Sequence, residues 1–157
     1  MGIEIDIPGY GTLGLEHVVM DYNGTLAVDG RIEPGVVEAL GRLAGRLTLH
    51  VITADTFGLA AAELSGVDCR LHVLEGGDHR QAKRDFAETL GSDTTAAIGN
   101  GRNDSMMLKS AALGIVVLLE EGAAVEALTA ADIVCPSIIS ALGLLENPMR
   151  LKATLRS

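Results

Sequence analysis

The sequence has 157 residues, with 12 basic and 21 acidic side chains and a formal net charge of −9. This length fits one domain, residues 1–157, with a hydrophobic core of its own. The acidic charge repels phosphate backbones and anionic lipids, and only 3% of the residues are aromatic. We therefore expect no nucleic-acid partner and no membrane partner.

Cysteine usage and the N-terminal segment predict the compartment. Cys69 and Cys135 lie in apolar runs without a CxxC partner, so we expect both to be reduced thiols. The N-terminus has no basic segment followed by an apolar one, and no apolar run is long enough to span a bilayer. These features predict a cytoplasmic protein.

The predicted elements begin with an antiparallel hairpin. Its strands are Ile3–Ile7 and Thr12–Glu16, around a turn that contains Pro8 and Gly9. We expect this hairpin to be added at an edge of the central sheet. At the other end of the chain, 147–156 predicts a short helix. Asn147 is its expected N-cap, and Pro148 lies in its first turn.

Between these ends, apolar runs of strand length alternate with helix-like segments. The predicted strands are His17–Tyr22, Leu47–Ala54, Cys69–Leu74, Thr94–Gly99, Gly114–Leu119 and Asp132–Cys135. The predicted helices are Pro34–Leu47, Phe57–Leu64, Asp78–Leu90, Asn103–Ala112, Gly122–Leu128 and Ser137–Leu145. Such alternation is typical of a parallel sheet covered on both faces. We predict a three-layer α/β fold with a doubly wound parallel sheet, whose ligand site lies at the carboxyl ends of the strands.

Polar residues follow two of the predicted strands. Asp21 ends the strand that begins at His17. In the turn after it, Gly24 allows close approach to the backbone and Thr25 offers a hydroxyl. A carboxylate that acts on a ligand and one that merely caps the turn are equal alternatives here. Thr53 ends the next buried strand at the matching place.

Two further segments carry polar groups. Lys83 lies on a predicted helix, where a solvated face is the commoner role of a single lysine. The glycine-rich loop Gly99–Asp104 follows the fourth strand and opens a helix. Backbone N–H groups, side-chain amides and one carboxylate therefore converge at this loop.

Taken in order, these segments resemble the four motifs of the haloacid dehalogenase superfamily of phosphotransferases. The residues that carry the resemblance are Asp21-Tyr22-Asn23-Gly24-Thr25, Thr53-Ala54-Asp55, Lys83 and Gly99-Asn100-Gly101-Arg102-Asn103-Asp104. The sequence is most similar to the phosphorylation domain of P-type ATPases and to its stand-alone, soluble relatives, from about His17 to Cys135. The resemblance implies a Rossmann-like hydrolase of the phosphatase kind.

The resemblance also implies roles for single residues. Asp21 would attack phosphorus and become an aspartyl phosphate, and Lys83 would neutralise the charge that builds up. The implied catalytic residues are Asp21, Asn23, Thr53 and Lys83. The implied phosphate-binding residues are Asp21, Gly24, Thr25, Thr53, Ala54, Lys83 and Asn103. The implied magnesium site comprises Asp21, the backbone carbonyl of Asn23, the side chain of Asn100, and Asp104, which would hold a metal-bound water or Lys83.

Two positions depart from the family pattern. Asn23 stands where the phosphatases have an Asp that protonates the leaving group and activates water, and an amide does neither. P-type ATPases also lack this Asp, so phosphorylation can persist, and we expect slow hydrolysis. Asn100 stands where an acidic metal ligand is usual, and the lost attraction is roughly 4 kcal/mol at 4 Å and an effective dielectric near 20. We therefore expect weaker magnesium binding.

The chain has no room for the cap that other family members carry. The interval from Thr25 to Thr53 fits a loop and one helix, and that from Thr53 to Lys83 fits a helix, a strand and a turn. We expect a capless protein whose copies cover one another as a dimer or tetramer. Its substrate would be a small phosphorylated molecule or a phosphoprotein.

Two functions follow from the sequence. The first is a magnesium-dependent phosphatase or phosphotransferase, which the retained nucleophile, hydroxyl, lysine and distal carboxylate favour. The alternative is a catalytically weak or inactive phosphate-binding or regulatory module, which the two asparagines favour. The histidines have no metal-ligand spacing, so we expect structural roles for all of them; they are His17, His50, His72 and His79.

Overall fold

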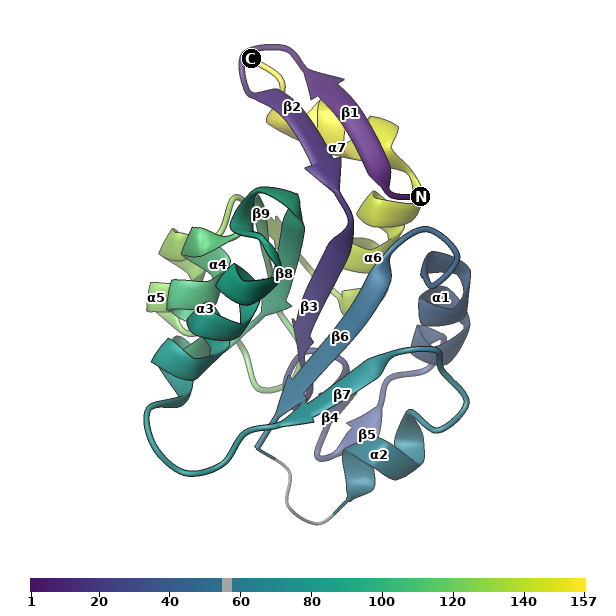
Figure 1. The fold of residues 1–157 in the computed structure, drawn as a ribbon, viewed down its shortest axis with the longest axis vertical. Coiled ribbons are helices and arrows are strands. Elements are labelled where there is room, and N and C mark those ends of the chain that lie inside the picture. Colours follow the sequence, from purple (N-terminus) through teal and green to yellow (C-terminus); the bar gives the residue numbers. More distant parts are fainter. Residues whose placement is uncertain (55–57) are drawn as a thin grey trace.

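The computed structural model describes residues 1–54 and 58–157, and a six-stranded sheet forms its centre (Figure 1). In spatial order, the strands are β10 (Ile133–Cys135), β9 (Leu113–Val117), β8 (Thr95–Gly99), β3 (His17–Asp21), β6 (Thr48–Thr53) and β7 (Arg70–Val73). Every pair of neighbouring strands is parallel. The predicted parallel sheet is therefore confirmed.

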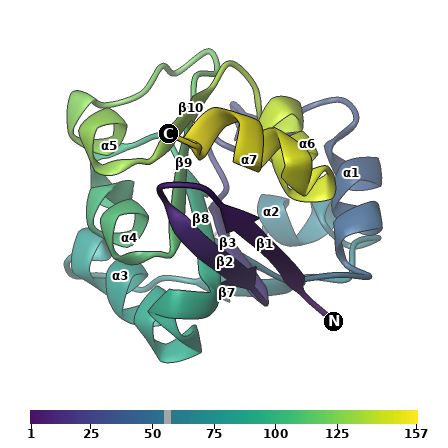
Figure 2. The same cartoon turned by 90° about the horizontal axis from the view of Figure 1, so that it is seen from above.

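Helices cover both faces of the sheet, as a doubly wound fold requires (Figure 2). One side carries α1 (Val36–Leu43), α2 (Leu59–Glu63) and α6 (Ile138–Glu146), and the other carries α3 (His79–Leu90), α4 (Ser105–Ser110) and α5 (Val125–Ala130). The short turns η1 (Ser92–Thr94) and η2 (Arg102–Asp104) precede β8 and α4. Within 1–54 and 58–157, no helix is both long and apolar enough to cross a membrane.

The core lies on both sides of the central strands. Every residue of β8 and β9 is buried. In β3, Val18 and Met20 belong to the cluster beneath α1 and α6, whereas Val19 packs beneath α3 and α4. This burial on both faces explains the near-continuous apolar runs of the sequence.

The N-terminal hairpin is confirmed, but its expected place at an edge of the central sheet is wrong, because it forms a separate two-stranded sheet. β1 (Ile3–Ile7) pairs antiparallel with β2 (Gly11–Leu15) and packs against α7 (Pro148–Leu155) (Figure 1). As predicted, Asn147 is the N-cap residue of α7 and Pro148 lies in its first turn. The side chain of Asn147 makes no capping hydrogen bond to α7, and its amide donates instead to the carbonyl of Gly143 at 3.0 Å.

A second small hairpin was not predicted. β4 (Ala27–Val28) pairs with β5 (Arg31–Ile32) in the interval where we expected only a loop and one helix. The hydroxyl of Tyr22 donates to the carbonyl of Gly30 at 2.7 Å and ties this hairpin to the end of β3. In the described part of the chain, this hairpin and α1 occupy the interval from β3 to β6, and α2 and β7 that from β6 to α3. Among the described residues, neither interval contains an inserted cap domain.

The position of β3 in the sheet creates the crevice for a ligand. From β3 the chain moves to β6 and β7 on one side, and then returns to β8 on the other. The loops that follow β3 and β8 therefore diverge, which leaves an opening at the carboxyl ends of these strands.

Candidate active site

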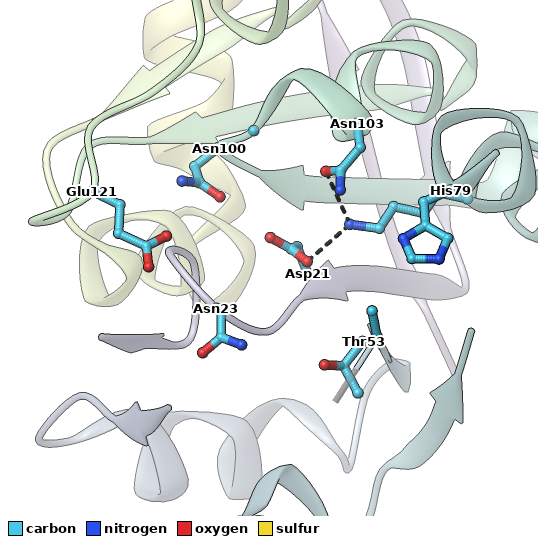
Figure 3. A pocket seen from close by; sticks show the side chains of 10 residues that line it. Asp21, Asn23, Thr53, His79, Asn100, Asn103 and Glu121 are labelled. Atoms are coloured by element: carbon cyan, nitrogen blue, oxygen red, sulfur yellow. Dashed lines mark hydrogen bonds and ion pairs between the residues drawn. The ribbon is translucent and has the colours of Figure 1, made fainter. Parts of the chain in front are cut away.

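A pocket of about 490 Å³ opens at this edge of the sheet (Figure 3). The residues that line it are Asp21, Asn23, Thr53, Ala54, His79, Lys83, Asn100, Gly101, Asn103 and Glu121. All of them except His79, Gly101 and Glu121 were predicted as site residues. Because parallel strands bring their carboxyl ends to one edge, segments distant in sequence meet here.

Lys83 is the buried cation of the pocket. Its side chain is 3% exposed. Its Nζ donates to Asp21 Oδ1 at 2.9 Å, to Asp104 Oδ1 at 2.8 Å and to Asn103 Oδ1 at 3.3 Å. Burial opposes the charge, but the two carboxylates raise the pKa of Lys83 above its ordinary value. The lysine is therefore charged, and the alternative of a solvated helix face is excluded.

Lys83 reaches the pocket because α3 starts where the sequence predicts. The carboxylate of Asp78 accepts a hydrogen bond from the backbone N–H of Arg80 at 3.1 Å, which caps the first turn. From this start, the face of α3 that carries Lys83 and Ala87 is buried. The cap thus marks the start of the helix that carries Lys83 to the pocket.

Asp104 lies behind Lys83 and outside the pocket wall. Its fully buried carboxylate accepts from Lys83 and also from the backbone N–H groups of Asn100 at 3.0 Å and Gly101 at 2.9 Å. A Cβ on Gly99 would collide with this carboxylate. Of the two roles expected for Asp104, the structure contains the contact with Lys83. It ties the loop after β8 to the lysine.

Asp21 is the carboxylate at the centre of the pocket. Its burial and the neighbouring carboxylate of Asp104 raise its pKa to about 7, and Lys83 only partly offsets both effects. Without further positive charge, the neutral form of Asp21 is therefore favoured more strongly than that of an ordinary carboxyl group. Its contact with Lys83 favours a role in the site over a simple turn cap.

The turn after Asp21 contacts the side chains of Asp21 and Asn100 from outside the pocket. Thr25 is buried, and its Oγ1 lies 3.5 Å from Asp21 Oδ2 and 3.4 Å from Asn100 Oδ1. Gly24 has a φ of 79°, and a Cβ there would collide with the side chains of Asn100 and Glu121. Neither Gly24 nor Thr25 is part of the pocket wall, although both were predicted to bind phosphate.

The predicted phosphate-binding residues that do line the pocket lie around Lys83. Thr53 is buried at the end of β6, and Ala54 follows it. Asn103, in η2, contacts the ammonium of Lys83. Asp55, which the second motif includes, lies outside the described residues. A hydroxyl, an amide and an ammonium group therefore line the same pocket as Asp21.

The oxygen atoms on the other side of Asp21 fit a hard divalent cation. The amide nitrogen of Asn100 donates to the carbonyl of Gly122 at 3.0 Å, which turns Oδ1 toward Asp21 (Figure 3). With Asp21 Oδ2 and the backbone of Asn23, this amide oxygen offers the donors that magnesium prefers. In 1–54 and 58–157, no group of three His, Cys, Asp or Glu residues is placed to hold a metal. A cation here would therefore depend on carboxylate, amide and carbonyl oxygens together.

Besides Gly101, which belongs to the fourth motif, two pocket residues were not predicted as site residues. Glu121 follows β9, and its carboxylate points into the space between Asn23 and Asn100 (Figure 3). His79 was expected to be structural, but it lines the pocket one helical turn before Lys83. The signals that point to them are a carboxylate shortly after a predicted strand and an i,i+4 spacing on the lysine's helix.

The other histidines pack together on the sheet, as expected. His50 Nε2 lies 3.2 Å from His17 Nδ1, and His50 Nδ1 lies 3.5 Å from His72 Nε2. Phe86 of α3 packs against the rings of His50 and His72. Burial and the neighbouring His17 and His72 lower the pKa of His50 to about 4. The cluster therefore contains a neutral central ring at physiological pH.

Comparison with known sequences identifies relatives whose role is unknown. No protein-family model matches the sequence. The uncharacterized protein MJ0073 of Methanocaldococcus jannaschii is 53% identical over 60 residues, which are 38% of this chain and 64% of that protein. The chain thus spans just under two thirds of the length of this relative.

Comparison with solved structures identifies the fold. The 3-deoxy-D-manno-octulosonate 8-phosphate phosphatase of Moraxella catarrhalis, solved with magnesium and phosphate, has a TM-score of 0.70 and 16% identity, over 90% of this chain and 94% of that chain. A hydrolase of the HAD superfamily from Legionella pneumophila has a TM-score of 0.67 and 19% identity, over 89% and 86% of the two chains. The chain therefore has the fold of the haloacid dehalogenase superfamily, as its four motifs indicated.

Proposed function

We propose that the chain is a phosphatase or phosphotransferase that forms an aspartyl phosphate on Asp21. The observation that carries this proposal is the buried bridge from Lys83 to Asp21, at 2.9 Å, and to Asp104, at 2.8 Å. An ammonium group beside the nucleophile reduces the repulsion between a carboxylate and an incoming phosphate. The shared fold with a phosphatase solved with magnesium and phosphate supports the same chemistry.

In the first step, a carboxylate oxygen of Asp21 attacks phosphorus and forms a new P–O bond. The bond to the leaving oxygen breaks, and that oxygen keeps the electron pair. Thr53, Lys83 and Asn103 line the pocket with hydroxyl, ammonium and amide groups that suit the oxygens of the phosphoryl group. This step needs Asp21 in its ionised form.

The residues opposite Lys83 would hold a magnesium ion. Asp21, Asn100 and the backbone carbonyl of Asn23 are the proposed ligands, and the ion would neutralise phosphate charge and lower the pKa of Asp21. Asn100 is held in the required orientation by its bond to Gly122. Because an amide carries no charge, we propose that position 100 contributes less to magnesium binding than an acidic ligand there would.

In the second step, water attacks the phosphorus of the aspartyl phosphate and Asp21 is released as the leaving carboxylate. A carboxyl group at position 23 would donate a proton to the first leaving oxygen and accept one from this water, and Asn23 does neither. We therefore propose slow hydrolysis with a preference for acyl and aryl phosphates, whose leaving oxygens depart without a proton.

The open pocket bears on the substrate and the assembly. With no inserted domain among the described residues, both a small phosphorylated molecule and a phosphoprotein fit the proposal. We propose that a second copy of the chain, in a dimer or tetramer, takes the place of a cap. Leu118 and Val134, exposed at the β9–β10 edge, offer apolar surface for such contact. The free thiols of Cys69 and Cys135 favour a reducing, cytoplasmic compartment.

The alternative is a phosphate-binding or regulatory module, which Asn23 and Asn100 favour because both line the pocket. Incubation with acetyl phosphate and magnesium, followed by mass spectrometry of peptides, separates the two functions. We expect a phosphoryl adduct on Asp21 in the wild type and none in Asp21→Asn. Fluorine NMR with beryllium fluoride provides a second readout of the same site. A wild type that forms neither the adduct nor the fluoride complex would favour the binding module.

A further inference from the structure

Glu121 brings a carboxylate to the pocket from a part of the chain that the four motifs do not include. It follows β9 and precedes α5, and it shares the pocket wall with Asp21, Asn23 and Asn100. Its carboxylate lies against the turn after β3, because a Cβ on Gly24 would collide with it. Glu121 is therefore placed beside the residues proposed to hold the cation.

The side of the pocket that contains Asn103 and His79 carries groups that suit phosphate oxygens. Asn103 contacts the ammonium of Lys83 at 3.3 Å, and in Figure 3 Asn103 and His79 lie on one side of Asp21, with Asn100 and Glu121 on the other. Groups for phosphate oxygens and groups for a cation are thus separated by the nucleophile. Glu121 belongs to the cation side.

The charges around the pocket are unbalanced. Asp21 and Asp104 share the single ammonium of Lys83. Glu121 adds a third carboxylate, and within residues 1–54 and 58–157 no ion pair or hydrogen bond engages it. Three carboxylates and one ammonium leave a formal charge of −2, which one divalent cation would balance.

We infer that Glu121 is a ligand of the divalent cation and supplies the negative charge that the amide at position 100 lacks. This inference rests on the proposed function, because that function requires a cation beside Asp21. Asn100 contributes a neutral oxygen from the loop after β8, and Glu121 contributes the charge from the loop after β9. The acidic ligand therefore follows β9, whereas the usual one follows β8.

The neighbouring residue offers a matched control. Glu120 is also exposed and carries the same charge in the same loop, but it lines a different hollow with Glu33 and Pro34. Glu120→Gln and Glu121→Gln therefore change net charge equally. Only Glu121→Gln removes a carboxylate from the pocket with Asp21.

The test is isothermal titration calorimetry of Mn²⁺, and of Mg²⁺ in competition, with protein free of substrate. We expect Glu121→Gln to weaken binding at least about 10- to 100-fold, because the loss of a residue that only supports a metal ligand already costs that much. We expect Glu120→Gln to change binding less than about twofold because its carboxylate is outside the site. Circular dichroism melts establish that both variants are folded. Equal affinities for the two variants would overturn the inference.

The same variants distinguish failure of this inference from failure of the proposed function. If Glu121→Gln binds Mn²⁺ like the wild type but loses turnover at saturating metal, Glu121 acts as an acid or base and is not a ligand. If only Glu121→Gln loses affinity, the inference holds, whatever the fate of acetyl phosphate. Absence of an adduct on Asp21 at saturating metal would instead refute the proposed function.

Discussion

The ionised form of Asp21 should destabilise the metal-free protein, and Asp21→Asn should remove this effect. The pKa of Asp21 is raised from its ordinary 3.8 to about 7 by burial and by Asp104, despite Lys83. The folded state therefore binds this proton more tightly than the unfolded state does. The stabilisation from this proton is complete at pH values below the pKa of Asp21 in the unfolded state. It is lost as the pH rises through the pKa of Asp21 in the folded state.

The size of the effect follows from the distance between the two pKa values. The two pKa values differ by about three units, and each unit corresponds to about 1.36 kcal/mol. Once Asp21 is ionised in both states, the free energy of unfolding is therefore lower by roughly 4 kcal/mol. A neutral amide of nearly the same shape avoids this cost. The stability advantage of Asp21→Asn over the wild type should thus grow by roughly 2 to 3 kcal/mol between pH 5 and pH 8.

Urea unfolding in the presence of EDTA measures this difference. Circular dichroism is the appropriate signal, because the sequence contains no tryptophan. Asp68→Asn removes an exposed carboxylate before β7, at the opposite end of the sheet, and is the matched control. Magnesium should flatten the pH dependence of the wild type and leave that of Asp21→Asn unchanged. Parallel pH profiles for the wild type and Asp21→Asn would refute the reasoning.

Three further outcomes are expected. Asn23→Asp should raise the hydrolysis of alkyl phosphates about 10²- to 10⁴-fold at saturating magnesium, as general acid–base assistance is typically worth; steady-state assays that show no gain on any ester would refute this. Asn100→Asp should tighten magnesium binding. It should also lower the unfolding free energy of the metal-free protein by about 1–3 kcal/mol, because a carboxylate oxygen would replace the amide nitrogen that donates to the carbonyl of Gly122. Calorimetry and urea unfolding measure the two effects, and unchanged metal-free stability would contradict the second. Light scattering should show a dimer or tetramer at micromolar concentration. A monomer would contradict the proposal that a second copy of the chain covers the pocket.

The strands and the main site residues could be predicted because one physical rule connects them. Strands buried on both faces are continuous apolar runs, as in β8 and β9, and their ends are visible in the sequence. Parallel strands direct these ends to one edge, so Asp21, Thr53 and Asn100 had to lie close together. The chemistry expected of them came from the resemblance to the four motifs.

The remaining site residues depend on loop geometry that sequence periodicity does not contain. Two adjacent glutamates follow β9, but only Glu121 lines the pocket with Asp21. The next residue, Gly122, has a φ of 71°, which a periodic pattern in the sequence does not reveal. His79 is the first residue of a helix, where its direction depends on the cap at Asp78. The β4–β5 hairpin has strands of two residues, which are too short for a periodic pattern.

The packing of the N-terminal hairpin on α7 has a consequence for synthesis on the ribosome. Ile3, Ile7 and Leu15 of the hairpin are buried in one cluster with Leu151 of α7. The hairpin therefore emerges roughly 140 residues before the helix that covers it. At about 5–20 residues per second, its apolar face stays open for roughly 7 to 30 seconds. Nascent chains that stop before Pro148 keep this face uncovered and should be recruited by chaperones, whereas chains extended through Leu155 should not.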